Sequence, residues 1–309
     1  MVKSAFLFPG QGAQYVGMGK DLYETNTVAK EYFDKASEIL GFNIADLCFS
    51  GPEAELTRTI NSQPAIFVVS IAFLKALEDK CSHLKPALTC GLSLGEYTAL
   101  VASGVLGFED ALKLVRRRGE LMENAGQENP GSMASIIGLD VAKCREICNE
   151  SKAELANLNS PEQTVISGTK GAIQQAITLA EKAGAKRAIE LNVSGAFHSS
   201  LMQSAADGLK EALAVIDFSE PKIPVITNVT ADYVKTVQDV KNNLSKQVTS
   251  SVRWVETIQR LSAEGVTQCY EIGPGKVLKG LARRINKELS VQCVGSVEEL
   301  DKLQTELTV

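Results

Sequence analysis

The chain has 309 residues, of which 44% are hydrophobic and 22% charged, and its formal net charge is −5. This composition is typical of a globular protein with a large core, and the acidic balance argues against a nucleic-acid-binding protein, whose domains usually carry a basic excess. The seven cysteines are scattered without a C-x-x-C pair and there are only two histidines, so we expect a reducing, cytoplasmic location and no bound metal.

Apolar segments and turn residues predict an α/β sheet in the first and last thirds of the chain. Short apolar strands are expected at 5–8 and 87–90, among amphipathic helices, as in a largely parallel sheet covered on both faces. The uncharged stretch 59–74 is interrupted by polar residues and a proline, so we interpret it as a buried helix and expect no membrane association. The expected helices are 28–40, 64–80, 96–103, 108–124, 200–216, 253–264 and 276–287.

The pattern between these parts is different and reads β-α-β-β-α-β, the order of a ferredoxin-like unit. Its strands are expected at 132–137, 154–159, 164–167 and 187–191, and its helices at 140–150 and 171–183. We therefore predict a ferredoxin-like small domain at 128–197, inserted into a large α/β domain formed by 1–127 and 198–309. A cleft between two such domains is a natural place for a substrate.

A candidate nucleophile lies at the end of the second predicted strand. The sequence Gly91-Leu92-Ser93-Leu94-Gly95 follows that strand directly and precedes a predicted helix. The glycines permit a tight turn that lifts the serine hydroxyl above the sheet edge, and the helix N-terminus directs N–H groups to the same point. A G-x-S-x-G sequence can also be an ordinary turn, but this context favours Ser93 as a nucleophile.

A serine needs a base to accept its proton, and histidine is the usual one near neutral pH. His83 lies in a polar connector, where a solvated loop residue is the simplest interpretation. His198 lies just before Ser200 and Gln203, which have the spacing of a capping box, so a helix N-terminus is expected to keep its imidazole neutral. We favour His198 as the base. No acidic residue stands out as its partner, and a carbonyl group could hold the imidazole instead.

Three consecutive arginines occupy the predicted helix 108–124. Only Arg118 lies at the edge of the apolar stripe of that helix, whereas Arg116 sits to the side and Arg117 lies on the opposite face. An inward guanidinium needs an anion, and its fork geometry suits a carboxylate. An internal salt bridge is the common alternative, and the pattern alone leaves both interpretations open.

Five motifs together resemble malonyl-CoA:acyl carrier protein transacylases, and they follow the order of that family from residue 4 to about 287. They are Phe8-Pro9-Gly10-Gln11-Gly12-Ala13-Gln14, Gly91-Leu92-Ser93-Leu94-Gly95-Glu96-Tyr97, Arg118-Gly119, Gly195-Ala196-Phe197-His198-Ser199 and Glu271-Ile272-Gly273-Pro274-Gly275. One position departs from the pattern, because the family commonly has histidine where this chain has Leu92. A polar contact at that point is therefore in doubt.

The resemblance implies an α/β-hydrolase-like large domain and an enzyme that moves malonyl from malonyl-CoA to the phosphopantetheine thiol of acyl carrier protein, for fatty acid synthesis. Ser93 would carry the acyl group, His198 would be the base and Arg118 would bind the malonyl carboxylate. Both thiols belong to the substrates, so no cofactor is expected.

The resemblance also implies three backbone roles. The N–H groups of Gln11 and Leu94 would form the oxyanion hole. The main-chain carbonyl of Gln247 would steady His198, which would explain why no acidic partner is evident.

Acyl carrier proteins are acidic, so a basic surface is expected near the cleft. Four basic residues recur at three- and four-residue steps on the predicted helix 276–287, and we interpret them as a candidate docking face. They are Lys276, Lys279, Arg283 and Lys287. A merely solvated charged face is the alternative.

Two other functions compete with acyl transfer. A serine esterase or thioesterase could use the same turn, but it has no need of an inward arginine, and an α/β-hydrolase carries an acid between the serine and the histidine in the chain. A non-enzymatic scaffold that binds carrier proteins would not need a nucleophile, a base and an arginine together.

Overall fold

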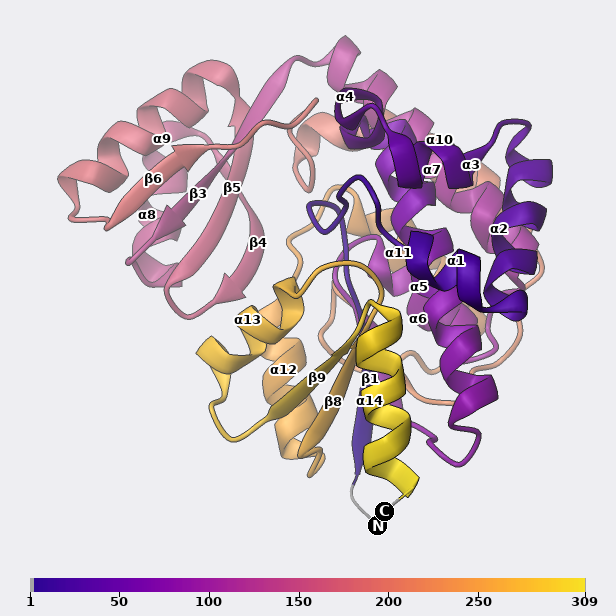
Figure 1. Ribbon diagram of the computed structural model, residues 1–309. Helices are drawn as coiled ribbons and strands as arrows, with labels where there is room; N and C mark the ends of the chain where they lie inside the picture. Colours follow the sequence, from indigo (N-terminus) through magenta and orange to yellow (C-terminus); the bar gives the residue numbers. More distant parts are fainter. Residues whose placement is uncertain (1–2, 309) are drawn as a thin grey trace.

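The computed structural model describes residues 3–308 and contains two β-sheets (Figure 1). The larger sheet has five strands in the order β7-β2-β1-β8-β9, and all of its neighbouring pairs are parallel. Its strands are β1 (Ser4–Phe8), β2 (Leu88–Gly91), β7 (Val225–Ile226), β8 (Gln268–Ile272) and β9 (Ser290–Val294). The predicted parallel α/β sheet is confirmed.

Helices cover both faces of this sheet. Because successive side chains of a strand point to opposite faces, Phe6 and Phe8 of β1 enter one core cluster while Ala5 and Leu7 enter a second. The first cluster includes residues of α5 and α6, and the second includes residues of α12 and α13 (Figure 1). The helices of this part are α1 (Lys20–Thr25), α2 (Thr27–Leu40), α3 (Ile44–Ser50), α4 (Glu53–Thr57), α5 (Thr59–Lys80), α6 (Gly95–Ala102), α7 (Phe108–Glu128), η1 (Ser200–Met202), α10 (Gln203–Ala214), α11 (Val237–Gln247), α12 (Trp254–Ala263), α13 (Val277–Ile285) and α14 (Val297–Thr308).

Helix α5 is long and apolar enough to cross a membrane by composition, but 83% of its most apolar window is buried inside the protein. It is therefore the core helix that the sequence predicts. It begins five residues earlier than expected, upstream of Pro64. Proline cannot donate to the carbonyl of Ile60, and Arg116 Nη1 donates to that oxygen instead at 2.9 Å.

The second sheet has four strands in the antiparallel order β4-β5-β3-β6. Its elements are β3 (Gly131–Ile137), α8 (Val141–Ser151), β4 (Glu154–Ser160), β5 (Gln163–Thr169), α9 (Lys170–Lys182) and β6 (Arg187–Glu190). Residues of α8 and α9 share one core cluster with this sheet. The ferredoxin-like order is confirmed, and all four strands lie inside the predicted insertion, whose boundaries at 128 and 197 remain a prediction.

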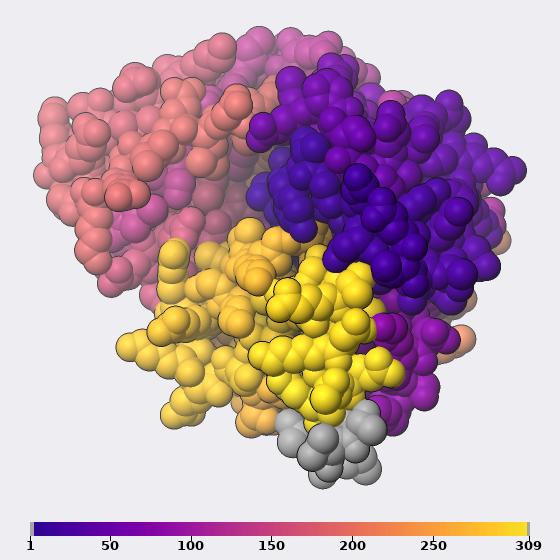
Figure 2. All heavy atoms as spheres, viewed as in Figure 1, coloured from indigo at the N-terminus to yellow at the C-terminus, as the bar shows by residue number. Residues whose placement is uncertain are grey.

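The small domain projects as a lobe beside the large one (Figure 2). Its strand β4 forms hydrogen bonds with a loop of the large domain. Val252 N donates to the Ala156 carbonyl at 2.8 Å, and Leu158 N donates to the Val252 carbonyl at 2.9 Å. These bonds join the small sheet to the loop that follows α11. Since α11 ends at Gln247, the small domain is attached next to a predicted site residue.

Candidate active site

Ser93 lies in the turn between β2 and α6 with a φ of 52°, in the left-handed region that few non-glycine residues adopt. The flanking glycines make this turn possible. A Cβ on Gly91 would lie 2.0 Å from the carbonyl carbon of Gly95, and one on Gly95 would lie 2.0 Å from the carbonyl oxygen of Phe8. The chain can therefore bend sharply here only because both positions lack side chains.

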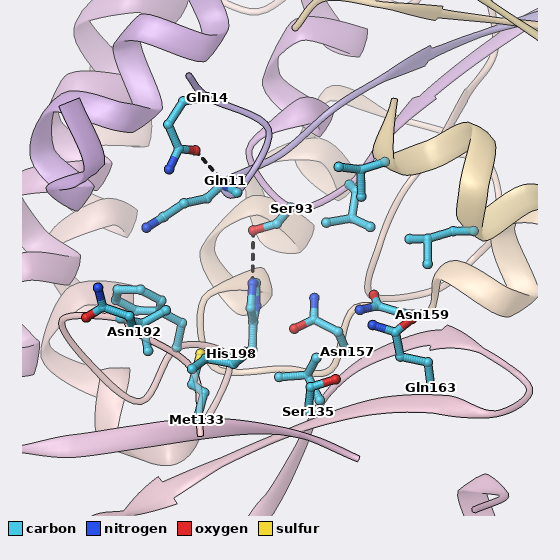
Figure 3. A pocket seen from close by; sticks show the side chains of 18 of the residues that line it. Gln11, Gln14, Ser93, Met133, Ser135, Asn157, Asn159, Gln163, Asn192 and His198 are labelled. Atoms are coloured by element: carbon cyan, nitrogen blue, oxygen red, sulfur yellow. Dashed lines mark hydrogen bonds between the residues drawn. The ribbon is translucent and has the colours of Figure 1, made fainter. Parts of the chain in front are cut away.

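His198 meets Ser93 across the pocket (Figure 3). Its Nε2 lies 2.9 Å from Ser93 Oγ, and its Nδ1 lies 2.8 Å from the carbonyl oxygen of Gln247. A carbonyl can only accept, so Nδ1 carries the proton and Nε2 is free to accept the serine proton. Burial and the neighbouring charge of Arg118 lower the pKa of His198 to about 4, which keeps the imidazole neutral.

The predicted capping box after His198 is wrong. Ser200 begins a 3-10 turn, and its N–H and Oγ bind the Glu154 carboxylate of β4, with Oγ–Oε1 at 2.5 Å. Gln203 Nε2 instead donates to Asp207 Oδ1 at 2.9 Å. A partner from the small domain has replaced the local cap, and burial and Arg118 lower the imidazole pKa. His83 is exposed on the turn after α5, as expected.

Arg118 points inward from α7 and is 1% exposed, whereas the side chains of Arg116 and Arg117 are 27% and 51% exposed. Its Nη1 donates to Gln63 Oε1 at 2.6 Å, and its Nη2 donates to Ser93 Oγ and Gln247 Oε1, both at 3.0 Å. Burial lowers its pKa. No carboxylate within residues 3–308 forms a salt bridge with it, and its Nε is buried without a partner. The internal salt bridge is therefore not the explanation for this arginine.

Gln11 and Leu94 lie on either side of the nucleophile. Gln11 follows β1 in the loop beside Ser93 (Figure 3), and Leu94 is the N-cap residue of α6. Neither backbone N–H donates to another group within the described part of the chain. Both N–H groups are therefore free of intramolecular hydrogen bonds among these residues, and their role as an oxyanion hole remains a prediction.

A cavity of about 360 Å³ opens in front of Ser93 and His198 between the two domains. Amide side chains line both of its sides, with Asn157, Asn159 and Gln163 opposite Gln11 and Asn192 (Figure 3). Apolar residues complete the wall, and they include Met122, Met133, Leu191, Val193, Phe197, Val277 and Leu281. Leu92, where the family commonly has histidine, also lines this cavity.

A buried polar network behind the nucleophile was not predicted from the sequence. Glu96 Oε2 accepts bonds from Gln247 Nε2 and from the N–H of Asn228, both at 2.8 Å. Burial raises the pKa of Glu96 to about 7. The motif around Ser93 contains Glu96, but Asn228 lies 135 positions from the serine, and nothing in its local sequence marks it.

The candidate docking face is less regular than predicted. Helix α13 spans Val277–Ile285, so Lys276 precedes it and Lys287 lies beyond its end. Of the four predicted residues, Lys279 and Arg283 lie on the helix itself, where both are exposed. Lys276 Nζ also pairs with Glu299 at 2.7 Å. The glycines and proline before α13 set its start at Val277, and the extended backbone of Asn286 ends it before Lys287.

The family model described as "Acyl transferase domain" matches residues 5–305. The class of the protein is therefore that of the acyltransferases, which agrees with a Ser–His pair on an α/β sheet that carries an inserted domain. The chain is 47% identical to the malonyl CoA-acyl carrier protein transacylase of Bacillus subtilis (strain 168), over 97% of this chain and 96% of that protein.

Solved structures give the same result. A malonyl-transacylase solved in complex with a type II PKS acyl-carrier protein matches with a TM-score of 0.96 and 40% identity, over 98% of this chain and 99% of that one. The acyl carrier protein S-malonyltransferase of Vibrio cholerae matches with a TM-score of 0.94 and 42% identity, over 97% and 99%. The chain belongs to the malonyl CoA-acyl carrier protein transacylase family.

Proposed function

We propose that this chain moves a malonyl group from malonyl-CoA to the phosphopantetheine thiol of acyl carrier protein, through an ester on Ser93. The observation that carries the proposal is the buried guanidinium of Arg118, which lies 3.0 Å from the Ser93 hydroxyl and forms no salt bridge with any carboxylate among the described residues. A buried cation beside a nucleophile favours an acyl group that brings an anion with it. Malonyl has a terminal carboxylate, and acetyl has none.

In the first half of the cycle His198 Nε2 accepts the proton of Ser93 as Oγ attacks the thioester carbonyl. The backbone N–H groups of Gln11 and Leu94 stabilise the oxyanion of the tetrahedral intermediate. The intermediate collapses with cleavage of the C–S bond, and the CoA sulfur leaves with the proton that His198 returns. The Gln247 carbonyl holds the imidazole in the correct tautomer throughout.

The second half reverses these roles. The thiol of the carrier protein gives its proton to His198 and attacks the Ser93 ester, and collapse of this intermediate returns the proton to Ser93. Arg118 holds the malonyl carboxylate while the first thiol leaves and the second arrives. Every proton transfer uses one imidazole, so the proposed cycle needs no metal and no resident cofactor. We place this activity in fatty acid synthesis in the cytoplasm, where CoA thioesters and carrier protein meet.

A serine esterase or thioesterase on the same turn is the alternative. Water would then take the place of the carrier thiol, and Arg118 would have no function. The two reactions differ in their product, because transfer gives acyl-thiol and hydrolysis gives free acid. The ratio of these products in the presence of holo carrier protein decides between them.

The experiment that tests the proposal is intact mass spectrometry after brief incubation with malonyl-CoA. We expect one malonyl group on the wild-type chain and none on Ser93→Ala, and we expect discharge when holo carrier protein is added. A wild-type chain that acquires no acyl group, or one that acquires it equally in Ser93→Ala, would contradict the proposal. Acetyl-CoA serves as the comparison donor and should label the wild type more slowly.

A further inference from the structure

Asn228 is wholly buried, and each of its polar groups forms a hydrogen bond, three of them around the nucleophile. Its Oδ1 accepts the N–H of Ser93 at 2.5 Å, and its Nδ2 donates to the carbonyl of Gly91 at 2.6 Å. Its own N–H donates to Glu96 Oε2 at 2.8 Å, and its carbonyl accepts the N–H of Arg253 at 3.0 Å. The Asn228 side chain thus bridges Gly91, two residues before the nucleophile, and Ser93 itself.

The register of the sheet explains how Asn228 reaches this place. Strands β7 and β2 are parallel, with Thr89 opposite Val225 and Cys90 opposite Ile226. Continuing the register by two residues brings Asn228 opposite Leu92, at the carboxyl edge of the sheet where the turn begins. The short edge strand β7 therefore delivers an amide side chain to the back of the Ser93 turn.

We propose that Asn228 is a positioning residue that holds Ser93 in its left-handed conformation and aims Oγ at His198. This inference rests on the proposed function, in which Ser93 carries the acyl group. A non-glycine residue with positive φ persists only where its surroundings fix it, and here Oδ1 and Nδ2 bind the two ends of the bend.

The same bonds decide which amide faces the substrate. Because Asn228 occupies the N–H of Ser93, that donor points away from the reacting carbonyl. The N–H of Leu94 then remains as the donor that the turn itself supplies to the oxyanion. Asn228 thus sets both the direction of the nucleophile and the choice of donor, without touching the substrate.

The test is Asn228→Ala, measured as single-turnover acylation of Ser93 at saturating donor. We expect acylation to slow by about tenfold or more, because small misplacements of a reacting group have large effects on rate. The donor concentration at half-saturation should stay within about twofold of the wild type, because Asn228 does not contact the donor. The loss should be equal for malonyl-CoA and acetyl-CoA, in contrast to a defect in carboxylate binding.

Thr89→Val is the matched control, since Thr89 is equally buried in β2 and its hydroxyl binds the Ala99 carbonyl at 3.3 Å rather than the turn. Acylation that is as slow in Thr89→Val at a similar loss of thermal stability would reduce Asn228 to a structural role and overturn the proposal. Unchanged acylation in Asn228→Ala would overturn it as well.

Asn228→Asp keeps the proposal testable if the alanine variant does not fold. It preserves the size of the side chain and an acceptor for Ser93 N–H, but a carboxylate cannot donate to the Gly91 carbonyl. We expect its acylation to slow by about threefold or more at unchanged half-saturation. Wild-type acylation in this variant would overturn the proposal. In every case wild-type labelling of Ser93 is measured alongside, so failure of the proposed function itself would be recognised by an unlabelled wild type.

Discussion

The hydroxyl oxygen of Ser93 lies 2.9 Å from His198 Nε2 and 3.0 Å from Arg118 Nη2. The serine proton is directed to the imidazole, because the guanidinium can only donate to the same oxygen. The proposed base and the proposed carboxylate-binding residue thus contact the same atom.

Arg118→Ala should therefore depress malonyl transfer far more than acetyl transfer. Loss of a buried, charge-assisted carboxylate contact costs about 3 kcal/mol, or about 100-fold in kcat/KM for malonyl-CoA. The acetyl reaction loses only the contacts that Arg118 makes within the protein, to Ser93, Gln63 and Gln247, and should fall much less. Steady-state kinetics with both donors measures the ratio.

Arg117→Ala is the control for that prediction, because this neighbouring side chain is 51% exposed and pairs with Glu120 at the surface. It should leave both donors unaffected. If Arg118→Ala reduced malonyl and acetyl transfer equally, Arg118 would be a structural residue and the proposed specificity would lose its basis.

The elements of this site that the sequence could predict are those that have a local signature. Glycines on both sides of Ser93 mark the turn, the 3.6-residue period of α7 separates Arg118 from Arg117, and two histidines leave few choices of base. The family resemblance added Gln11, whose backbone role has no side-chain signature. Each of these positions is recognisable within a few residues of itself.

The elements that the sequence analysis misjudged or missed depend on contacts between distant segments. Ser200 has the spacing of a cap, yet Glu154 from the other domain takes its N–H and hydroxyl. Asn228 and Glu96 are partners only because β7 and β2 run in parallel. Lys276 forms a salt bridge with Glu299 of α14, a helix that the sequence analysis did not predict. Tertiary partners, rather than local preference, decided these positions.

The pH dependence of acylation should report the lowered pKa of His198. The imidazole must be neutral to accept the Ser93 proton, and burial together with Arg118 brings its pKa to about 4. The acylation rate should therefore rise with pH around 4 and be flat from about 5 to 8, whereas an ordinary histidine would give a midpoint near 6.5. Single-turnover rates in buffers of constant ionic strength provide the profile, and a midpoint near 6.5 would contradict the described environment.

Glu271 should make the protein less stable as the pH rises. A surface carboxylate in an ion pair has the opposite effect, because its pKa is lowered on folding. Burial raises its pKa to about 7, although the N–H groups of Leu278 and Lys279 bind its oxygens at 2.8 Å and cap α13. The folded state thus holds a proton that the unfolded state releases above about 4.5. The raised pKa of Glu271 therefore adds to the free energy of unfolding below about pH 4.5. This added stability, about 3 kcal/mol in total, is lost as the pH rises through 7.

Glu271→Gln removes this titration, so the stability of the wild type relative to the variant should decline between pH 4.5 and 8. Denaturant unfolding at several pH values measures the difference. Taking the difference also cancels contributions from Glu96 and His198, whose pKa values are shifted in opposite directions. Parallel pH curves for the two proteins would show that Glu271 is ionised in the fold.

Reversing Lys279 and Arg283 to glutamate should weaken only the half-reaction that involves carrier protein. Both side chains are exposed on α13, whose Val277 and Leu281 line the pocket, so an acidic carrier that docks there would place its phosphopantetheine arm at the cavity. We expect KM for holo carrier protein to rise about tenfold and to become less sensitive to salt, while acylation by malonyl-CoA is unchanged.

Lys170→Glu with Lys182→Glu on α9 reverses two exposed charges on the small domain and controls for the change in net charge. An equal rise in KM in both double variants would mean that overall charge, rather than α13, attracts the carrier, and an unchanged KM in the α13 variant would exclude this helix as the docking face.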